Sequence, residues 1–345
     1  MFENTIMKEH IKREVYVMAK IKGQSIIYLS HLKDRWRRLW KDEEAKFRIA
    51  TALKMTAIPF MSFIIMSALF WLLLKMNFSF FKANEFRGIE AFEEVFFHFI
   101  NQALLEVIPY AALLMVFVNL TAIYVSDILL RPFRLIGEYC EGRNNSKDVS
   151  YNPDFFTDLK LLSQFSEYFF SCMETAEKNN KLGLVVVPKK YVKIHKPVFE
   201  ATFFLHYALF ILASLLAVSI ALYAFGNGLH SNLIVLAEQT LPNNPAINYY
   251  LSQQKETIDV MITFVLVIST FLYMGLASHL YYKVAAPSFA IFATMRAFLK
   301  GNHDQRVHLI GFSYLRNQTR KLNKYLDWVQ KSLVTDIVVE STDEE

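Results

Sequence analysis

The sequence predicts an all-α membrane protein whose four transmembrane helices form two repeats, each followed by a helix, a connector and a second helix. Apolar residues make up 54% of the 345 residues, with 31 Phe and 17 Tyr, and soluble domains rarely have such a composition. Four stretches are long and apolar enough to cross a bilayer, and one pattern of spans and loops occurs twice along the chain. These observations place the chain in the membrane class.

The expected segments follow from hydropathy and from the duplication. The spans lie at about 52–74, 107–130, 200–225 and 257–282. The segments are a basic amphipathic N-terminal segment (1–51), a first hairpin (52–130), a helix-connector-helix segment (131–178), a linker (179–199), a second hairpin (200–282), a second helix-connector-helix segment (283–333) and an acidic tail (334–345). The similar stretches "SDILLR" from Ser126 and "SHLYYK" from Ser278 support the duplication.

Basic residues predict the orientation in the membrane. Residues 1–51 carry 12 Lys and Arg, residues 131–198 carry 11 and residues 283–345 carry nine. The loops 75–106 and 226–256 carry only three and one. The positive-inside rule therefore places both termini in the cytoplasm. The two loops are too short for a folded sensor domain, and we expect them to extend the flanking spans as helical hairpins.

The C-terminal segment has the clearest pattern outside the spans. Pro287 stands where a new helix is expected to start, and Gly301 with Asn302 is expected to end that helix. Val307 lies in the connector, and a second helix is expected from near Gly311. Its apolar positions repeat every seven residues with one polar gap at Thr319, as in a coiled-coil seam. The expected core consists of Pro287, Ile291, Met295, Phe298, Gly301, Val307, Leu315, Leu322, Leu326, Val329 and Leu333.

The first repeat has a less regular copy of this pattern. Pro132 begins it, and Gly142 follows after ten residues, against 14 from Pro287 to Gly301, which predicts a first helix about one turn shorter. The second helix has a regular seam at Phe155, Leu159, Leu162, Ser166, Phe169 and Met173.

The two segments resemble HAMP domains, the linker modules of bacterial transmembrane receptors. The residues that carry the resemblance are Pro287, Gly301 with Asn302, Val307 and "KLNKYL" from Lys321. The Asp-Glu pair that usually opens the second helix is absent, and Ser313 and Tyr314 stand near its place. The resemblance implies a parallel coiled coil of four helices in a protein of the bacterial inner membrane. Either the two copies within one chain pack on each other as a pseudo-symmetric monomer, or two chains form a homodimer.

Polar residues in the spans predict contacts inside the membrane. His206 and His279 lie at similar depth in the second hairpin, and Asp127 occupies the position in the first repeat that corresponds to His279. Such residues serve as proton or metal groups or, more commonly, form hydrogen bonds between helices. Asp127 either pairs with His279 across the pseudo-two-fold axis or lies at the membrane interface with water, and we expect the pair.

The stretch from Tyr28 to Phe47 predicts an amphipathic helix at the membrane surface. Trp36, Arg37, Arg38 and Trp40 combine aromatic and basic side chains, which suits the headgroup layer of anionic lipid. No nucleic-acid docking motif accompanies them.

The chain has no catalytic or cofactor motif. Phosphate-binding Gly-rich loops, GxSxG, HExxH and CxxC are missing, and the two cysteines, Cys140 and Cys172, exclude a disulfide framework. We therefore expect no enzyme, cofactor or metal. Two functions remain: a signal relay that passes a membrane-helix movement to a separate membrane or cytoplasmic protein, or an assembly or scaffold factor of a larger membrane complex. A transporter is less favoured, because four spans with few polar residues make a poor pathway.

Overall fold

The computed structural model describes most of the chain after Lys41. The described residues are 42–85, 89–147, 149–153, 159–183, 185–240 and 245–340. The chain divides into two compact units, residues 1–47 and 48–345. The expected membrane-surface helix with Trp36, Arg37, Arg38 and Trp40 lies outside the described residues, as does Phe155 of the first seam.

All regular elements of the described residues are helices. In chain order they are α2 (Glu43–Ala83), α3 (Ile89–Asn144), α4 (Lys160–Lys178), α5 (Lys189–Val192), α6 (Ala201–Thr240), α7 (Pro245–Gln253), α8 (Lys255–Leu299), the 3-10 turn η1 (Ser313–Leu315) and α9 (Arg316–Glu340). Four of them, α2, α3, α6 and α8, are long and apolar enough to cross a membrane, which confirms the four expected spans by length and composition. The spans extend into the two loops as helices, since α2 reaches Ala83 and α6 reaches Thr240.

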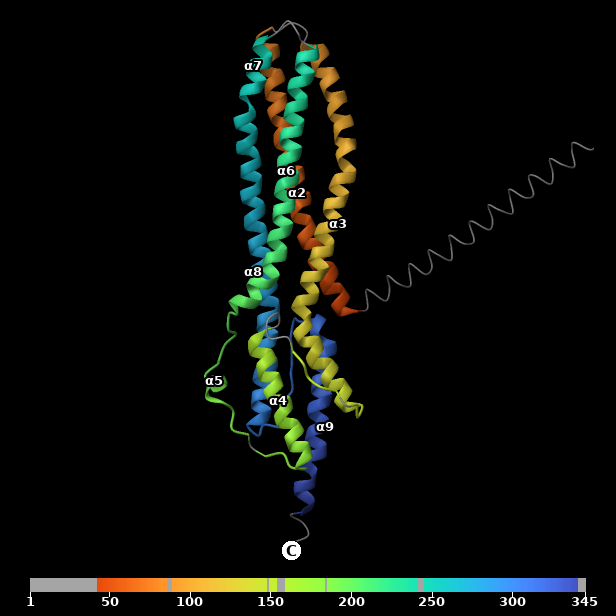
Figure 1. The fold of residues 1–345 in the computed structure, drawn as a ribbon, viewed down its shortest axis with the longest axis vertical. Coiled ribbons are helices and arrows are strands. Elements are labelled where there is room, and N and C mark those ends of the chain that lie inside the picture. Colours follow the sequence, from red (N-terminus) through yellow and green to blue (C-terminus); the bar gives the residue numbers. More distant parts are fainter. Residues whose placement is uncertain are drawn as a thin grey trace, which may run out of the picture. The chain divides into compact units, whose positions relative to one another are not determined.

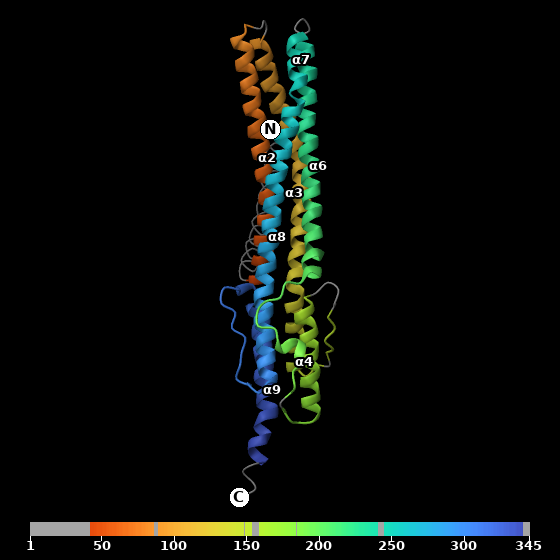
Figure 2. The ribbon, with the colours of Figure 1, turned by 90° about the vertical axis from the view of Figure 1, so that its left-hand side faces the viewer.

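The four long helices of residues 48–345 pack side by side along their membrane-crossing parts (Figures 1 and 2). Two polar pairs join α2 to α8 and to the residue directly before it. The hydroxyls of Ser62 and Ser269 lie 2.7 Å apart, and the amides of Asn77 and Gln254, the N-cap of α8, exchange two hydrogen bonds of 2.6 Å. All four side chains are buried. Hydrogen bonds of this kind hold helices together where apolar surfaces alone give little specificity.

The helices α3 and α8 continue without a break beyond the membrane-crossing part. Pro132 lies inside α3 and Pro287 lies inside α8. The expectation that a new helix starts at each proline is therefore wrong. A proline removes one N–H from the helix ladder, but the helix persists where the freed carbonyl finds another donor. For Pro287 that carbonyl belongs to Lys283, and the hydroxyl of Tyr314 donates to it at 2.7 Å.

The ends of the two continuous helices correspond more closely than the sequence suggests. After α8, Gly301 adopts a left-handed φ of 96°, and the N–H of Asn302 donates to the carbonyl of Ala297. After α3 the left-handed residue is Ser146, with φ of 54°, and not Gly142. Ser146 lies 14 residues after Pro132, as Gly301 lies 14 after Pro287, so the expected shorter first helix is also wrong.

Candidate functional site

Beyond the prolines, four helical segments pack into a second bundle. We call it the lower bundle: residues 132–144 of α3, 160–178 of α4, 288–299 of α8 and 316–333 of α9. In Figures 1 and 2 all four segments run in the same direction, away from the membrane-crossing helices. The connector after α8 returns the chain to the start of η1 and α9. The lower bundle is where the expected seams meet.

The seam of α4 packs against α8. The rings of Phe165 and Phe292 lie 4.6 Å apart, and those of Phe169 and Phe298 lie 6.2 Å apart. Between them, the hydroxyl of Ser166 approaches the sulfur of Met295 at 3.7 Å. The contacts advance together along both helices, so α4 and α8 are parallel. The expected seam residues Leu159, Leu162, Ile291 and Met295 are each at most 2% exposed.

The other contact of the lower bundle joins α9 to α3. Lys321 forms an ion pair of 2.6 Å with Glu141, and the rings of Tyr325 and Tyr139 lie 6.3 Å apart. At Gly137 an added Cβ would lie 3.4 Å from the Cα of Gln318 and would displace the Gln318 side chain, so α3 and α9 approach each other closely here. The expected seam residues of η1 and α9 are all buried: Leu315, Thr319, Leu322, Leu326, Val329 and Leu333.

These contacts cross between the repeats. The first helix of each repeat packs against the second helix of the other, α3 against α9 and α4 against α8. The polar positions of the two seams, Ser166 and Thr319, are both buried. Each falls four residues after a buried leucine, Leu162 or Leu315. The lower bundle thus closes its core within one chain.

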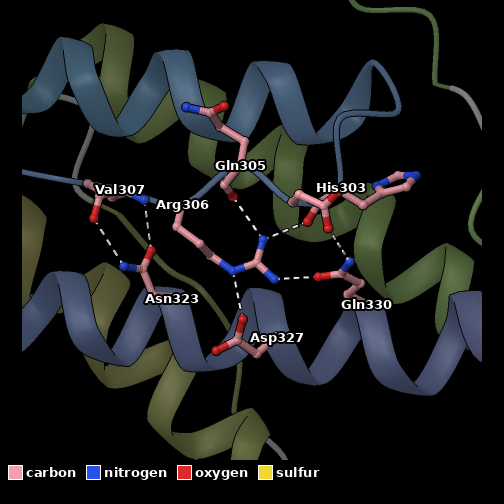
Figure 3. A network of polar contacts seen from close by, with 8 residues as sticks. His303, Gln305, Arg306, Val307, Asn323, Asp327 and Gln330 are labelled. Atoms are coloured by element: carbon pink, nitrogen blue, oxygen red, sulfur yellow. Dashed lines mark hydrogen bonds and ion pairs between the residues drawn. The ribbon is translucent and has the colours of Figure 1, made fainter.

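A polar network fixes the connector between α8 and α9 (Figure 3). The side-chain amide of Asn323 accepts a hydrogen bond from the N–H of Val307 at 2.9 Å and donates to its carbonyl at 3.0 Å. The Arg306 guanidinium donates to Asp327 at 2.7 Å, to Gln330 and to the carbonyl of His303 at 2.6 Å. Val307 itself is 4% exposed. The connector is therefore part of the bundle, held by one face of α9.

A second polar cluster links α3 to α4 near the far end of the lower bundle. The hydroxyl of Tyr139 donates to Glu174 at 2.7 Å, and Arg143 pairs with Glu177. The Tyr325 hydroxyl beside this cluster is buried and has no hydrogen-bond partner among the described residues. Burial raises the pKa of Tyr325 well above its usual value. Sequence patterns did not indicate this cluster, because its residues lie on three separate helices.

Glu200 connects the start of α6 to the start of α4. Its carboxylate accepts hydrogen bonds from the backbone N–H groups of Lys160 at 2.6 Å and Leu161 at 3.0 Å. It thereby caps the N-terminus of α4. Burial raises the pKa of the Glu200 carboxyl, and the two N–H groups act in the opposite direction. The residue directly before a membrane helix thus holds a helix of the lower bundle.

The expected pair of Asp127 and His279 is not formed. Asp127 accepts from Arg48 at 2.8 Å and from Arg134 at 3.1 Å, whereas a ring nitrogen of His279 lies 3.4 Å from the Lys54 ammonium. Arginine outcompetes a histidine for a carboxylate because it is always charged and donates in a fork. His206, the third expected polar residue, has its ring 5.8 Å from that of Phe210.

Comparisons with known proteins add no relative. No protein-family model, curated protein or solved structure matches this chain. Within the described part of the chain, no group of three His, Cys, Asp or Glu residues is placed to hold a metal ion.

Proposed function

We propose that this protein is a signal relay of the bacterial inner membrane, with a HAMP-like lower bundle that passes a membrane-helix movement to a separate partner protein. The observation that carries the proposal is the continuity of α3 and α8 from the membrane-crossing part into the lower bundle. A shift or rotation of either helix reaches the bundle without a flexible joint. Shifts of ~1–2 Å are typical of such transitions.

The parallel packing, the docked connector and the two polar seam positions support a HAMP-like bundle. Pairing of the two copies within one chain supports a pseudo-symmetric monomer. A relay needs two packings that differ by only a few kcal/mol, so that a small movement in the membrane changes their populations. The buried hydroxyls of Ser166 and Thr319 suit this need, because polar groups in a seam lower the stability of any one packing.

A scaffold is the second candidate, and the aromatic core favours it. The ring of Phe165 contacts that of Phe292 edge to face, and the ring centroids of Phe170 and Tyr139 lie 4.2 Å apart. Large rings in specific contacts contribute ~0.5–1.5 kcal/mol per pair beyond burial and oppose repacking. In this alternative the lower bundle is a rigid stalk on which a larger membrane complex assembles.

Distance measurements between spin labels distinguish the two functions. Labels are placed at the exposed positions Glu167 on α4 and Lys324 on α9, in a Cys140→Ala, Cys172→Ser background. The protein is reconstituted into bilayers of different thickness, which changes helix tilt. A relay gives two distance populations whose ratio changes with thickness. A single population in every bilayer refutes the relay and supports the scaffold.

The matched control carries both labels on one helix, at Asn317 and Lys331 of α9. These positions are 14 residues apart, or about 21 Å at 1.5 Å per residue, and should keep one distance in every bilayer. Crosslinking in cells followed by mass spectrometry then identifies the partner. Recovery of a kinase, cyclase or receptor component agrees with the relay, and recovery of several subunits of one envelope complex agrees with the scaffold.

A further inference from the structure

The linker between the two repeats carries a cluster of positive charge at the base of α6. Between Glu177 and Glu200 the chain has no acidic residue. From α5 onward, four lysines and one histidine of this linker are exposed, and the described residues form no ion pair with them: Lys189, Lys190, Lys193, His195 and Lys196. Glu200, the next acidic group, directs its carboxylate to the backbone of α4. The cluster therefore presents uncompensated charge.

Side chains of α8 fix the position of this cluster. The Arg296 guanidinium donates to the carbonyls of Tyr191 at 2.8 Å and Ile194 at 2.7 Å. The hydroxyl of Tyr281 donates to the carbonyl of Val198 at 3.0 Å. Tyr191 is 5% exposed, and its ring contacts that of Phe165 at 4.9 Å. These contacts hold the linker backbone in a fixed position between α5 and the first turn of α6 (Figure 1).

An apolar groove between α6 and α8 begins where the cluster ends. Phe199, at 61% exposure, lies 5.5 Å from Phe204, which lines the near end of the groove. From there the groove follows the two helices past Ala208 and Met274. Leu205, Leu209 and Leu212 on its wall are more than half exposed, as expected of side chains that face lipid.

The chemistry of the groove fits a hydrocarbon chain. Its hydroxyls are already used, since Thr270 donates to the carbonyl of Leu266 and Tyr273 donates to that of Met55. The groove encloses about 220 Å³. Pockets for small molecules are usually ~300–1,000 Å³ and have a few convergent polar groups that orient the ligand. A narrow apolar groove without a free donor suits an acyl chain.

We propose that the groove and the linker together bind one anionic phospholipid of the adjacent leaflet. One acyl chain lies between α6 and α8, and the phosphate lies against Lys193, His195 and Lys196. Charge complementarity selects an anionic headgroup over a zwitterionic one, because basic residues at a membrane surface attract anionic lipid strongly. The linker that holds the headgroup also contains Tyr191, whose ring packs against Phe165 of α4 and Phe292 of α8. The binding itself is independent of the relay function.

Native mass spectrometry of the full chain in detergent tests the proposal. The delipidated protein is titrated with dioleoyl phosphatidylglycerol, with dioleoyl phosphatidylcholine and with inorganic phosphate as a competitor. We expect one phosphatidylglycerol to bind before any phosphatidylcholine. Lys193→Gln with Lys196→Gln should weaken that binding on the order of 30-fold. Ala208→Phe, which fills the groove, should weaken it as well.

The control variant exchanges the same residue type elsewhere, Lys300→Gln with Lys324→Gln. Both lysines are exposed, Lys300 directly after α8 and Lys324 on α9. It should bind phosphatidylglycerol as the native chain does, and thermal melting checks that every variant is folded. Equal binding of the two lipids, or equal losses in the two lysine variants, overturns the proposal. Full competition by millimolar inorganic phosphate also overturns it, because the groove then contributes nothing. Crosslinking of the linker to an acidic protein, without lipid selectivity, assigns the surface to a protein instead.

Discussion

Tyr314→Phe is the sharpest test of how α8 passes through Pro287. The substitution removes one hydroxyl and leaves the ring of a residue that is 8% exposed. Because Pro287 has no N–H, the carbonyl of Lys283 then loses its donor, the 2.7 Å hydrogen bond from Tyr314. This hydrogen bond is partly buried, and a carbonyl left without a partner away from water costs ~1–3 kcal/mol. Opening of the helix around Lys283 should therefore become about 5-fold to 150-fold more frequent.

A double-mutant cycle isolates the cause. In a Pro287→Ala background the new N–H at position 287 donates to the Lys283 carbonyl, so that Tyr314→Phe should cost less than ~0.5 kcal/mol. Hydrogen exchange of peptides that cover residues 280–292, measured by mass spectrometry, gives the free energy of local opening for all four proteins. An equal cost of Tyr314→Phe in both backgrounds would refute the reasoning.

The matched control is Tyr325→Phe on α9, the helix that follows η1. Tyr325 is 0% exposed, and its hydroxyl has no hydrogen-bond partner among the described residues. Removing a buried hydroxyl without a partner should leave stability unchanged or raise it. A loss as large as that of Tyr314→Phe would show that removal of any buried hydroxyl destabilises this bundle, and that Pro287 is not the cause.

Four further substitutions test the lower bundle and its junction with the membrane helices. Asn323→Ala removes two hydrogen bonds to the connector. It should lower the free energy of local opening of residues 303–312, measured by hydrogen exchange, by ~1–3 kcal/mol, whereas Asn317→Ala on the exposed face of α9 should leave it almost unchanged. Phe169→Ala should cost ~3–5 kcal/mol of unfolding free energy, and a loss below ~1 kcal/mol would contradict the packing of α4 on α8. Because burial raises the pKa of Glu200, the free energy of unfolding should fall as pH rises from about 4.3 through that raised pKa. Glu200→Gln should remove this slope in melting curves, and an identical slope in the variant would count against burial of the Glu200 carboxyl as its cause. Asp127→Asn breaks only partly exposed ion pairs and should change the free energy of unfolding by at most ~1 kcal/mol.

Sequence patterns correctly predicted the features that depend only on neighbouring residues of the chain. Hydropathy predicted all four spans, because crossing a bilayer requires about 20 apolar residues in a row wherever they occur. Seven-residue periodicity predicted the faces of α4 and α9 that are buried, since a helix has to cover its apolar stripe. Gly301 marked the end of α8, because a left-handed residue at a helix end is usually glycine.

Expectations failed where a distant residue decides the local structure. Pro287 does not break α8, because Tyr314 satisfies the carbonyl that the proline leaves free. Ser146 ends α3 in a conformation that the sequence predicts for Gly142. Asp127 bonds to Arg48 and Arg134, since a carboxylate takes the strongest cation within reach and not the residue at the corresponding position of the other repeat.

The sequence by itself determined which segments are helical, which are apolar enough for the membrane and which faces need a partner. Only the tertiary structure decided that α3 pairs with α9 and α4 with α8, that Glu200 caps α4, and that the basic linker adjoins the groove between α6 and α8. The physical reason is that apolar stripes and charges are not directional. They require burial or a counter-charge, but they do not specify which of several suitable surfaces provides it, and the choice depends on shape, on hydrogen-bond geometry and on the path of the connecting chain.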